Sequence, residues 1–384
     1  MMVTPAAAVS VLIVLLCLLL VMREAVDFAL LLRGAAAARR YRSAGFAGDA
    51  LLKSPLIPGV AVIAVPPDAS VESRLQVRSL LEMRSGDAEV IAVLNGATDA
   101  ERTLWVNEFQ LESEGPCIYR PRNPAPLRVI DRQPGTFAEC LNTGAALTDK
   151  AVIAVADRGV EVSEECLLVA MEHMLAGTGR TIALSVSGPP QAVSGWPALS
   201  FRLEYLRNWL MHCALATGNC ALPLSGSLTL FDRETVLRLG GFRRGPLEMV
   251  VRLHRMLRAT RSGEQIGFLP LAVARPRVPR SRQESREARA RMRAGERSAI
   301  AISRMVQYWL WPYDSMALAV LAGAAAAFGW MEPRVLVLVL GATVSMRVLT
   351  SMTAALLAEY AAPAGGRPLD LAALFLAALC FWMN

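Results

Sequence analysis

The stretch Val60-Ala61-Val62-Ile63-Ala64-Val65-Pro66-Pro67-Asp68 decides the fold class of this chain. Its first six residues are apolar and mostly β-branched, which is typical of a strand that is buried on both faces of a sheet. The two prolines cannot donate a backbone hydrogen bond to a neighbouring strand, so they end it. The sequence therefore predicts a central strand with Asp68 just beyond its carboxyl end.

Further periodic runs follow along the chain. Residues 89–94, 151–156 and 181–186 have strand character, whereas residues 71–84 and 162–175 carry apolar side chains at helical spacing. Strands that alternate with helices over short connections form a mostly parallel sheet that is covered on both faces. We therefore predict an α/β fold with a mixed, mainly parallel sheet and helices on both faces.

Polar side chains lie at the ends of three of these runs. Asp68, Asn95 and Asp157 each stand at or just beyond the end of an apolar segment. The carboxyl ends of parallel strands meet at one edge of an open sheet, and ligands bind at that edge. The sequence therefore predicts that these three side chains gather around a ligand of the nucleotide type.

Several short motifs occur in a fixed order over about residues 58–300. They are residues 60–66, residues 89–99 with the turn Asn95-Gly96-Ala97-Thr98-Asp99, Leu141-Asn142-Thr143-Gly144, Asp157-Arg158-Gly159, residues 225–242, Glu248-Met249 and residues 288–295. In this order they resemble the motifs of family-two glycosyltransferases, which have the GT-A fold and use nucleotide sugars. Together with the apolar ends of the chain, they resemble the membrane-integrated, cellulose- or hyaluronan-synthase-like branch of that family.

The resemblance implies a set of site residues and ligands. It implies nucleotide binding by Pro66, Asp68, Asn95, Asp99 and Asp157, a Mg²⁺ or Mn²⁺ ion held weakly by Asp157, acceptor or phosphate contacts by Arg289 and Arg291, and a catalytic Glu248 beside a base position that Met249 occupies. The donor would be a nucleotide sugar.

The chain departs from the family pattern at the positions that carry the chemistry. Leu94 and Asn95 replace the acidic pair of the nucleotide turn, and Gly159 replaces the second carboxylate of the metal motif. Divalent cations prefer several hard oxygen ligands, so Asp157 alone holds one weakly. Met249 cannot accept a proton, and the loss of a positioned base costs about 10²- to 10⁴-fold in rate.

Simpler roles are open for the same residues. Asp157 can form a turn, Asp99 can cap the helix that follows it, and Glu248 can pair with a nearby arginine on the surface. The arginine-rich stretch Arg275–Arg297 can lie against phospholipid, or it can bring Arg289 and Arg291 to a phosphate.

The two ends of the chain are apolar. Apolar residues make up 54% of the sequence and charged residues 19%. A helix of about 20 apolar residues spans a bilayer, and arginines follow the first apolar run, so the positive-inside rule predicts a multi-pass protein of the inner (cytoplasmic) membrane with a cytoplasmic main domain. The expected transmembrane helices that flank the fold are Ala6–Met22, Ser315–Trp330, Val335–Ala358 and Leu369–Met383. The expected units are residues 1–45 (membrane helix and basic segment), 55–273 (GT-A-like domain), 274–313 (basic juxtamembrane helices) and 314–384 (C-terminal membrane helices).

Composition also excludes some kinds of site. The net charge of +7 comes mainly from arginine, and with the apolar ends it favours membrane lipid as a partner. Nucleic acid is excluded because aromatic residues are not interleaved with the basic ones. A structural zinc site is disfavoured, since the seven cysteines include no CxxC pair and there are only three histidines.

Three functions remain. The combined losses favour a scaffold or regulatory protein of cell-envelope or exopolysaccharide assembly, with weakened or lost catalysis, that works beside an active synthase. The alternative is an active inverting glycosyltransferase that moves a sugar from a nucleotide-sugar donor to a lipid or glycan acceptor. The third, a membrane protein that shares only α/β packing with this family, is disfavoured by the ordered motifs.

Overall fold

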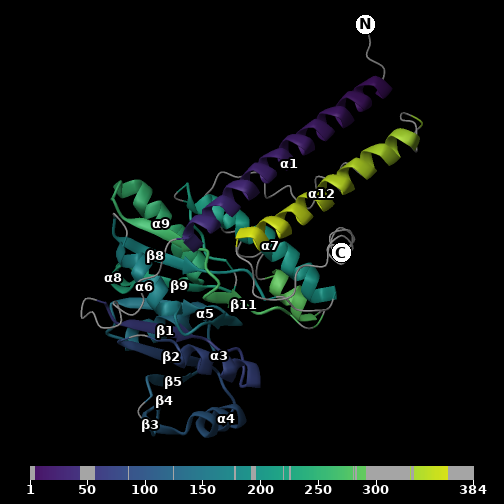
Figure 1. The fold of residues 1–384 in the computed structure, drawn as a ribbon. Helices are drawn as coiled ribbons and strands as arrows, with labels where there is room; N and C mark the ends of the chain where they lie inside the picture. Colours follow the sequence, from purple (N-terminus) through teal and green to yellow (C-terminus); the bar gives the residue numbers. More distant parts are fainter. Residues whose placement is uncertain are drawn as a thin grey trace.

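The structure is a computed structural model of the chain. It describes residues 5–43, 57–84, 86–123, 125–176, 179–191, 196–218, 220–224, 226–279, 281, 283–290, 329 and 333–361. Figure 1 shows a sheet with helices on both faces and two long helices, α1 and α12, that project from it side by side.

Within the described residues, nine strands form one sheet in the order β10-β8-β9-β6-β1-β2-β5-β4-β3. Their bounds are β1 (Val60–Ala64), β2 (Ala88–Asn95), β3 (Leu111–Gly115), β4 (Ile118–Pro121), β5 (Leu127–Arg132), β6 (Val152–Ala156), β8 (Thr181–Val186), β9 (Leu228–Asp232) and β10 (Gln265–Leu269). The central strands β6, β1, β2 and β5 are parallel, whereas β9 runs antiparallel between β6 and β8. The sheet is therefore mixed, with a parallel centre and antiparallel pairings on either side of it.

The central strand β1 is buried along its whole length. Val60, Val62 and Ala64 face one side of the sheet, and Ala61 and Ile63 face the other. Side chains alternate along a strand, so a strand with helices over both faces must be apolar at every position. This requirement explains the unbroken apolar run that identifies the strand in the sequence.

Each face of the sheet carries its own set of helices. One face packs against α5 (Phe137–Leu147), α7 (Trp196–Ala216) and α9 (Pro246–Thr260), and the other against α3 (Val71–Leu81), α4 (Asp99–Phe109) and α6 (Cys166–Ala176). The short helix α8 (Arg233–Arg238) follows β9, and β7 (Val160–Val162) pairs with β11 (Ala274–Pro276) in a small second sheet. Gly144 lets α5 approach closely, because a Cβ there would lie 2.9 Å from the Ile63 side chain.

The long helices α1 (Pro5–Ser43) and α12 (Pro333–Ala361) pack against α7 and against each other (Figure 1). Polar side chains join them. Asp27 of α1 and Arg207 of α7 form an ion pair of 3.0 Å, and Thr350 of α12 donates a hydrogen bond of 2.8 Å to Glu24. The second half of α1 therefore directs charged groups toward other helices of the protein.

This packing corrects the expected location. Among the described residues, none of the helices combines the length and the apolar character that a membrane span requires. The described side chains of α1 include Arg23, Glu24 and Asp27, which directly follow the predicted span Ala6–Met22 and are buried. The predicted multi-pass membrane location is therefore wrong, and the fold class stands without the flanking transmembrane helices. Two of the predicted spans, Ser315–Trp330 and Leu369–Met383, lie outside the described residues apart from Gly329.

Candidate functional site

The carboxyl ends of β1, β2, β5 and β6 meet at one edge of the sheet. We name this region the carboxyl edge; it consists of the last residue of each of these strands and the segments 65–70, 96–99, 133–136 and 157–159 that follow them. The helices α3, α4 and α5 begin there, capped by the side chains of Ser70, Thr98 and Thr136. Helix N-termini carry partial positive charge, so three of them at one edge favour an anionic ligand.

Asp68 lies in the connection after β1, behind Pro66. One of its carboxylate oxygens accepts hydrogen bonds from the Ser70 backbone (3.1 Å) and the Ser73 hydroxyl (2.7 Å). Burial raises the pKa of the Asp68 carboxyl, but these hydrogen bonds and the positive charge of Arg158 lower it by more, so the net pKa lies below the usual range of an aspartate. Asp68 is therefore an anchored, ionised carboxylate at the carboxyl edge.

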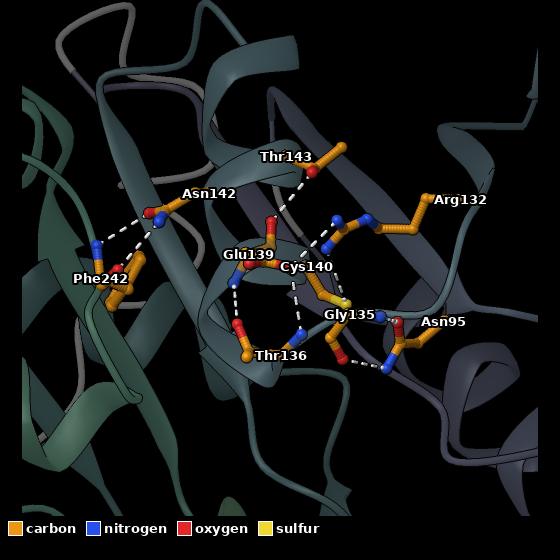
Figure 2. Close-up of polar contacts among 9 residues, drawn as sticks. All are labelled: Asn95, Arg132, Gly135, Thr136, Glu139, Cys140, Asn142, Thr143 and Phe242. Carbon is orange, nitrogen blue, oxygen red and sulfur yellow. Dashed lines mark hydrogen bonds and ion pairs between the residues drawn. The ribbon is translucent and has the colours of Figure 1, made fainter.

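Asn95 ends β2 and is engaged by the protein itself. Its side-chain nitrogen donates to the Gly135 carbonyl oxygen (2.9 Å), and its side-chain oxygen accepts from the Gly135 backbone nitrogen (2.8 Å), as Figure 2 shows. Both halves of the amide are used in holding β2 to the connection that leads into α5. The structure therefore gives Asn95 a positioning role at this edge.

Asp99 is the first residue of α4 and has a more open environment. Its side chain is 96% exposed and pairs with Arg102 at 2.7 Å. Arg102 also pairs with Asp131 of β5 at 2.5 Å, so its charge is shared between two carboxylates. Thr98, rather than Asp99, caps α4, because its hydroxyl accepts from the Glu101 backbone. The carboxylate of Asp99 thus stays accessible to a ligand.

Asp157 follows β6, and its carboxylate holds the chain around it. One oxygen accepts from the Arg158 backbone nitrogen (2.8 Å), and the other accepts from the Gly226 backbone nitrogen (2.6 Å). Gln76 of α3 adds two more bonds, donating to the Asp157 carbonyl oxygen (2.8 Å) and accepting from the Gly159 nitrogen (3.4 Å). Asp157 therefore connects β6, the start of β9 and, through Gln76, α3.

This edge offers little to a divalent cation. Both carboxylate oxygens of Asp157 already accept backbone hydrogen bonds, although each keeps a lone pair, and Gly159 supplies no ligand at the second position of the motif. In the part of the chain that the structure describes, no group of three or more His, Cys, Asp or Glu side chains could hold a metal ion. Mg²⁺ needs about six oxygen ligands. The residues present do not fit a tightly bound cation.

The position at which the resemblance places a general base is buried. Met249 has a relative exposure of 0% and belongs to the core under α9. The neighbouring Glu248 lies in the first turn of α9, with one carboxylate oxygen 3.7 Å from Arg252. Its other oxygen is buried and has no hydrogen-bond partner among the described residues. Glu248 directly precedes the buried Met249 in the sequence, and one of its carboxylate oxygens has no partner among the described residues.

The predicted arginines of residues 288–295 are only partly described. Arg289 lies against α7, where it pairs with Glu204 (3.0 Å) and donates to Ser200 (2.5 Å). Arg291 lies outside the described residues. The structure thus ties Arg289 to α7 and brings together at the carboxyl edge the other predicted residues Pro66, Asp68, Asn95, Asp99 and Asp157.

Two further contacts involve α5. Asn142 of α5 brackets the backbone of Phe242, donating to its carbonyl oxygen and accepting from its nitrogen, both at 2.8 Å (Figure 2). Arg132, at the end of β5, pairs with Glu139 at 3.2 Å (Figure 2). Asn142 lies in the motif Leu141–Gly144, which marked the residue without giving its partner. Arg132 had no local signal in the sequence.

A separate hollow lies at the opposite edge of the sheet. It has a volume of about 520 Å³ and is lined by apolar side chains such as Met171 and Met174, with Arg180 and Asp232 among its polar residues. Arg180 and Asp232 pair at 2.8 Å. Because β6 and β8 begin here and β9 ends here, this hollow is distinct from the predicted site.

Comparison with known proteins supports the fold. No protein-family model and no curated protein sequence matches the chain. A solved mannosyltransferase from Pyrobaculum calidifontis, in complex with GDP-Man and Mn²⁺, is similar with a TM-score of 0.59 and 17% identity, over 96% of this chain and 99% of that one. Glucosyl-3-phosphoglycerate synthase from Mycobacterium tuberculosis, in complex with Mn²⁺, UDP and glucosyl-3-phosphoglycerate, has a TM-score of 0.42 and 15% identity, over 67% of this chain and 86% of that one.

The similarity to the mannosyltransferase, with a TM-score above 0.5, bears on the fold. The mannosyltransferase was solved with GDP-Man and Mn²⁺, and at 17% identity its likeness to this chain shows the fold alone. The membrane-integrated, cellulose- or hyaluronan-synthase-like branch gains no support from these similarities. The sheet order and the similarity to the mannosyltransferase show that this chain has the GT-A fold of glycosyltransferases.

Proposed function

We propose that this chain is a glycosyltransferase-like protein that binds a nucleotide sugar at the carboxyl edge and has weakened or lost catalysis. The observation that carries the proposal is the complete burial of Met249 at the position where the resemblance places a general base. A group in the core cannot take a proton from an acceptor hydroxyl. Loss of a positioned base lowers the rate by about 10²- to 10⁴-fold.

Retained binding is supported by what the carboxyl edge keeps. Three capped helix N-termini begin there, and Asp68 and Asp99 offer carboxylates that can accept hydrogen bonds from a base or a ribose. Phosphates favour helix N-termini, and nucleosides favour acceptor groups, so the two parts of a nucleotide have complementary surfaces at one edge.

A protein that binds a donor without turning it over can serve as a scaffold or regulatory partner. We place it beside an active glycosyltransferase in polysaccharide assembly, following the resemblance to polymer-forming enzymes. In this role, the fraction of the protein with bound nucleotide sugar would depend on the donor concentration, and the partner would respond to that fraction. Co-purification with an active synthase from the native source would support this role.

A second candidate is an active inverting glycosyltransferase. It is favoured by Glu248, because one buried oxygen of this carboxylate has no hydrogen-bond partner among the described residues. An unsatisfied buried acceptor costs about 1–3 kcal/mol and is often explained by function. If the first turn of α9 moves when an acceptor binds, this oxygen could accept the proton in place of position 249.

One experiment separates the two candidates. The purified chain is titrated with GDP-Man and with UDP-glucose by calorimetry, and release of the nucleoside diphosphate is followed in the same solutions with Mn²⁺. We expect binding of at least one donor with release at or near the rate of the uncatalysed control. Release at ordinary enzymatic rates that Glu248→Gln abolishes would favour the active enzyme, and absence of binding by every donor would refute both candidates.

A further inference from the structure

We propose that the Arg158 guanidinium neutralises the diphosphate of the donor, so that the chain binds a nucleoside diphosphate without a divalent cation. This inference rests on the proposed function, because it concerns the same site. It goes beyond that function in two ways: it names the group that binds the phosphates, and it predicts that the divalent cation can be removed without loss of binding.

The backbone at Arg158 is fixed from three sides. The Asp157 carboxylate accepts from the nitrogens of Arg158 and Gly226, and Gln76 of α3 bonds to both neighbours of Arg158. The nitrogen of Arg277 also donates to the Gly159 carbonyl oxygen at 2.9 Å. Gly159 itself has a φ of +73°, which favours glycine. A residue held in this way presents its side chain from a constant position.

The side chain of Arg158 is exposed, and within the described residues its guanidinium has no hydrogen bond or ion pair. The other described arginines near this edge are already paired: Arg277 with Glu72, Arg102 with Asp99 and Asp131, Arg132 with Glu139, and Arg74 with Glu108. Arg158 is therefore the described arginine of this edge whose charge is left for a ligand.

The charge of Arg158 acts where a phosphate would lie. It is one of the causes that lower the pKa of Asp68, so its field reaches the tip of β1 from the connection after β6. These strands are neighbours in the sheet. An anion between the two tips would also meet the carboxylates of Asp68 and Asp157, which repel it. A positive charge is needed there to offset this repulsion.

The ligand chemistry favours arginine over a cation at this position. One carboxylate, Asp157, supplies one of the roughly six ligands that Mg²⁺ requires. A guanidinium is always charged and can donate two parallel hydrogen bonds to a phosphate. The second carboxylate of the metal motif is absent, and the motif has in its middle an arginine that forms no ion pair with the described residues.

The test measures binding of GDP and UDP to the full chain by calorimetry in EDTA, in Mg²⁺ and in Mn²⁺. We expect the dissociation constant of the better ligand to change less than about threefold between EDTA and Mn²⁺, since the protein offers the cation a single carboxylate ligand. Arg158→Gln should weaken binding by about 10- to 100-fold, the range of a charge-assisted hydrogen bond. The dissociation constant of Arg158→Lys should lie between those of the wild type and Arg158→Gln, because lysine keeps the charge but loses the paired donors.

The matched control is Arg238→Gln, which removes an exposed arginine of α8 at the opposite edge and should leave binding unchanged. Thermal unfolding of each variant checks that it is folded. Binding that requires Mg²⁺ or Mn²⁺ would overturn this inference and leave the proposed function standing, as would unchanged binding by Arg158→Gln. Absence of binding under all three conditions would remove the proposed function as well.

Discussion

The side-chain amide of Asn95 and the backbone of Gly135 are hydrogen-bonded in both directions, at 2.9 and 2.8 Å. The pair resembles the exchange of two hydrogen bonds between neighbouring strands, and it continues the contact of β2 with β5 beyond the end of the strands. Asn95, for which the resemblance predicts a nucleotide contact, therefore also links the end of β2 to the connection before α5. A carboxylate at this position could accept from Gly135 but could not donate to it.

We expect both Asn95→Ala and Asn95→Asp to lower the free energy of unfolding by about 1–2 kcal/mol, since one loses two hydrogen bonds and the other loses one and gains repulsion from the carbonyl oxygen. Urea denaturation at pH 7 measures the effect. The exposed Asn107→Ala in α4 serves as the control and should change stability by less than about 0.5 kcal/mol. Equal stabilities of the Asn95 variants and the wild type would show that the pair contributes nothing.

The sequence predicts the central strands of the sheet better than its outer strands. Strands β1, β2, β6 and β8 coincide with the predicted apolar runs, because strands covered on both faces must be apolar throughout. Strands β3 and β4 form the outer hairpin, and β3 (LESEG) is mostly exposed and has no apolar run. Edge strands with polar side chains leave a weak periodic signal, so the prediction missed them.

The candidate site shows the same division. That Asp68, Asn95 and Asp157 share one edge follows from their positions at strand ends. Their partners do not, since Gly135 is 40 residues from Asn95 and Gly226 is 69 residues from Asp157. These contacts depend on which connections come together in space and on backbone groups that every residue type carries. No local pattern in the sequence encodes them.

The contact between Gly241 and Asn142 allows a prediction with an internal control. Gly240 and Gly241 have φ of +78° and +73°, but a Cβ at Gly241 would lie 2.5 Å from the Asn142 side-chain oxygen, whereas one at Gly240 meets nothing within 4 Å. We expect Gly240→Ala to cost about 1–2 kcal/mol from the backbone conformation alone. Gly241→Ala should cost about 1–3 kcal/mol more, because the oxygen is held by Phe242.

Urea denaturation of the two variants measures this difference, and a second background isolates its cause. When Asn142→Ala removes the crowded oxygen, the cost of Gly241→Ala should fall to that of Gly240→Ala. If the extra cost persists in that background, crowding by Asn142 is not its source.

The three histidines predict a loss of stability in mild acid. Burial lowers the pKa of His212 to about 4, despite the opposing hydrogen bond to the Leu222 carbonyl oxygen. The pKa values of His173 and His254 are also lowered, mainly by burial. Free histidine titrates near pH 6.5, so between there and the folded pKa values the unfolded chain binds more protons than the folded one. Stability is thus complete above about pH 6.5 and falls as the pH drops toward 4.

Each of these histidines contributes up to about 1.4 kcal/mol per pH unit to the slope in this window. Urea denaturation at intervals from pH 7.5 to 4.5 gives the free energy of unfolding. His212→Gln keeps an amide donor for Leu222 and removes the titration, so its profile should be flatter by about one proton. A profile parallel to that of the wild type would mean that His212 titrates normally in the folded protein.

The burial of Met249 can be tested at the position where the resemblance predicts a general base. Met249 is fully buried in the core under α9, so Met249→Asp would place an ionisable group away from water and without a partner. Such a change costs about 3 kcal/mol or more. Met249→Leu keeps a similar apolar volume and should cost less than about 1.5 kcal/mol. Urea denaturation of both variants at pH 7 measures the two costs.

The same two variants test what the position does for catalysis. Because position 249 faces the core, Met249→Asp should release no more nucleoside diphosphate from GDP-Man or UDP-glucose than Met249→Leu does, in any temperature range where both variants are folded. The opposite result, a Met249→Asp variant as stable as the wild type with rapid sugar transfer, would mean that the first turn of α9 can present this residue to an acceptor. The weakened catalysis would then rest on a single replaced side chain, and the fold around it would be competent for the reaction.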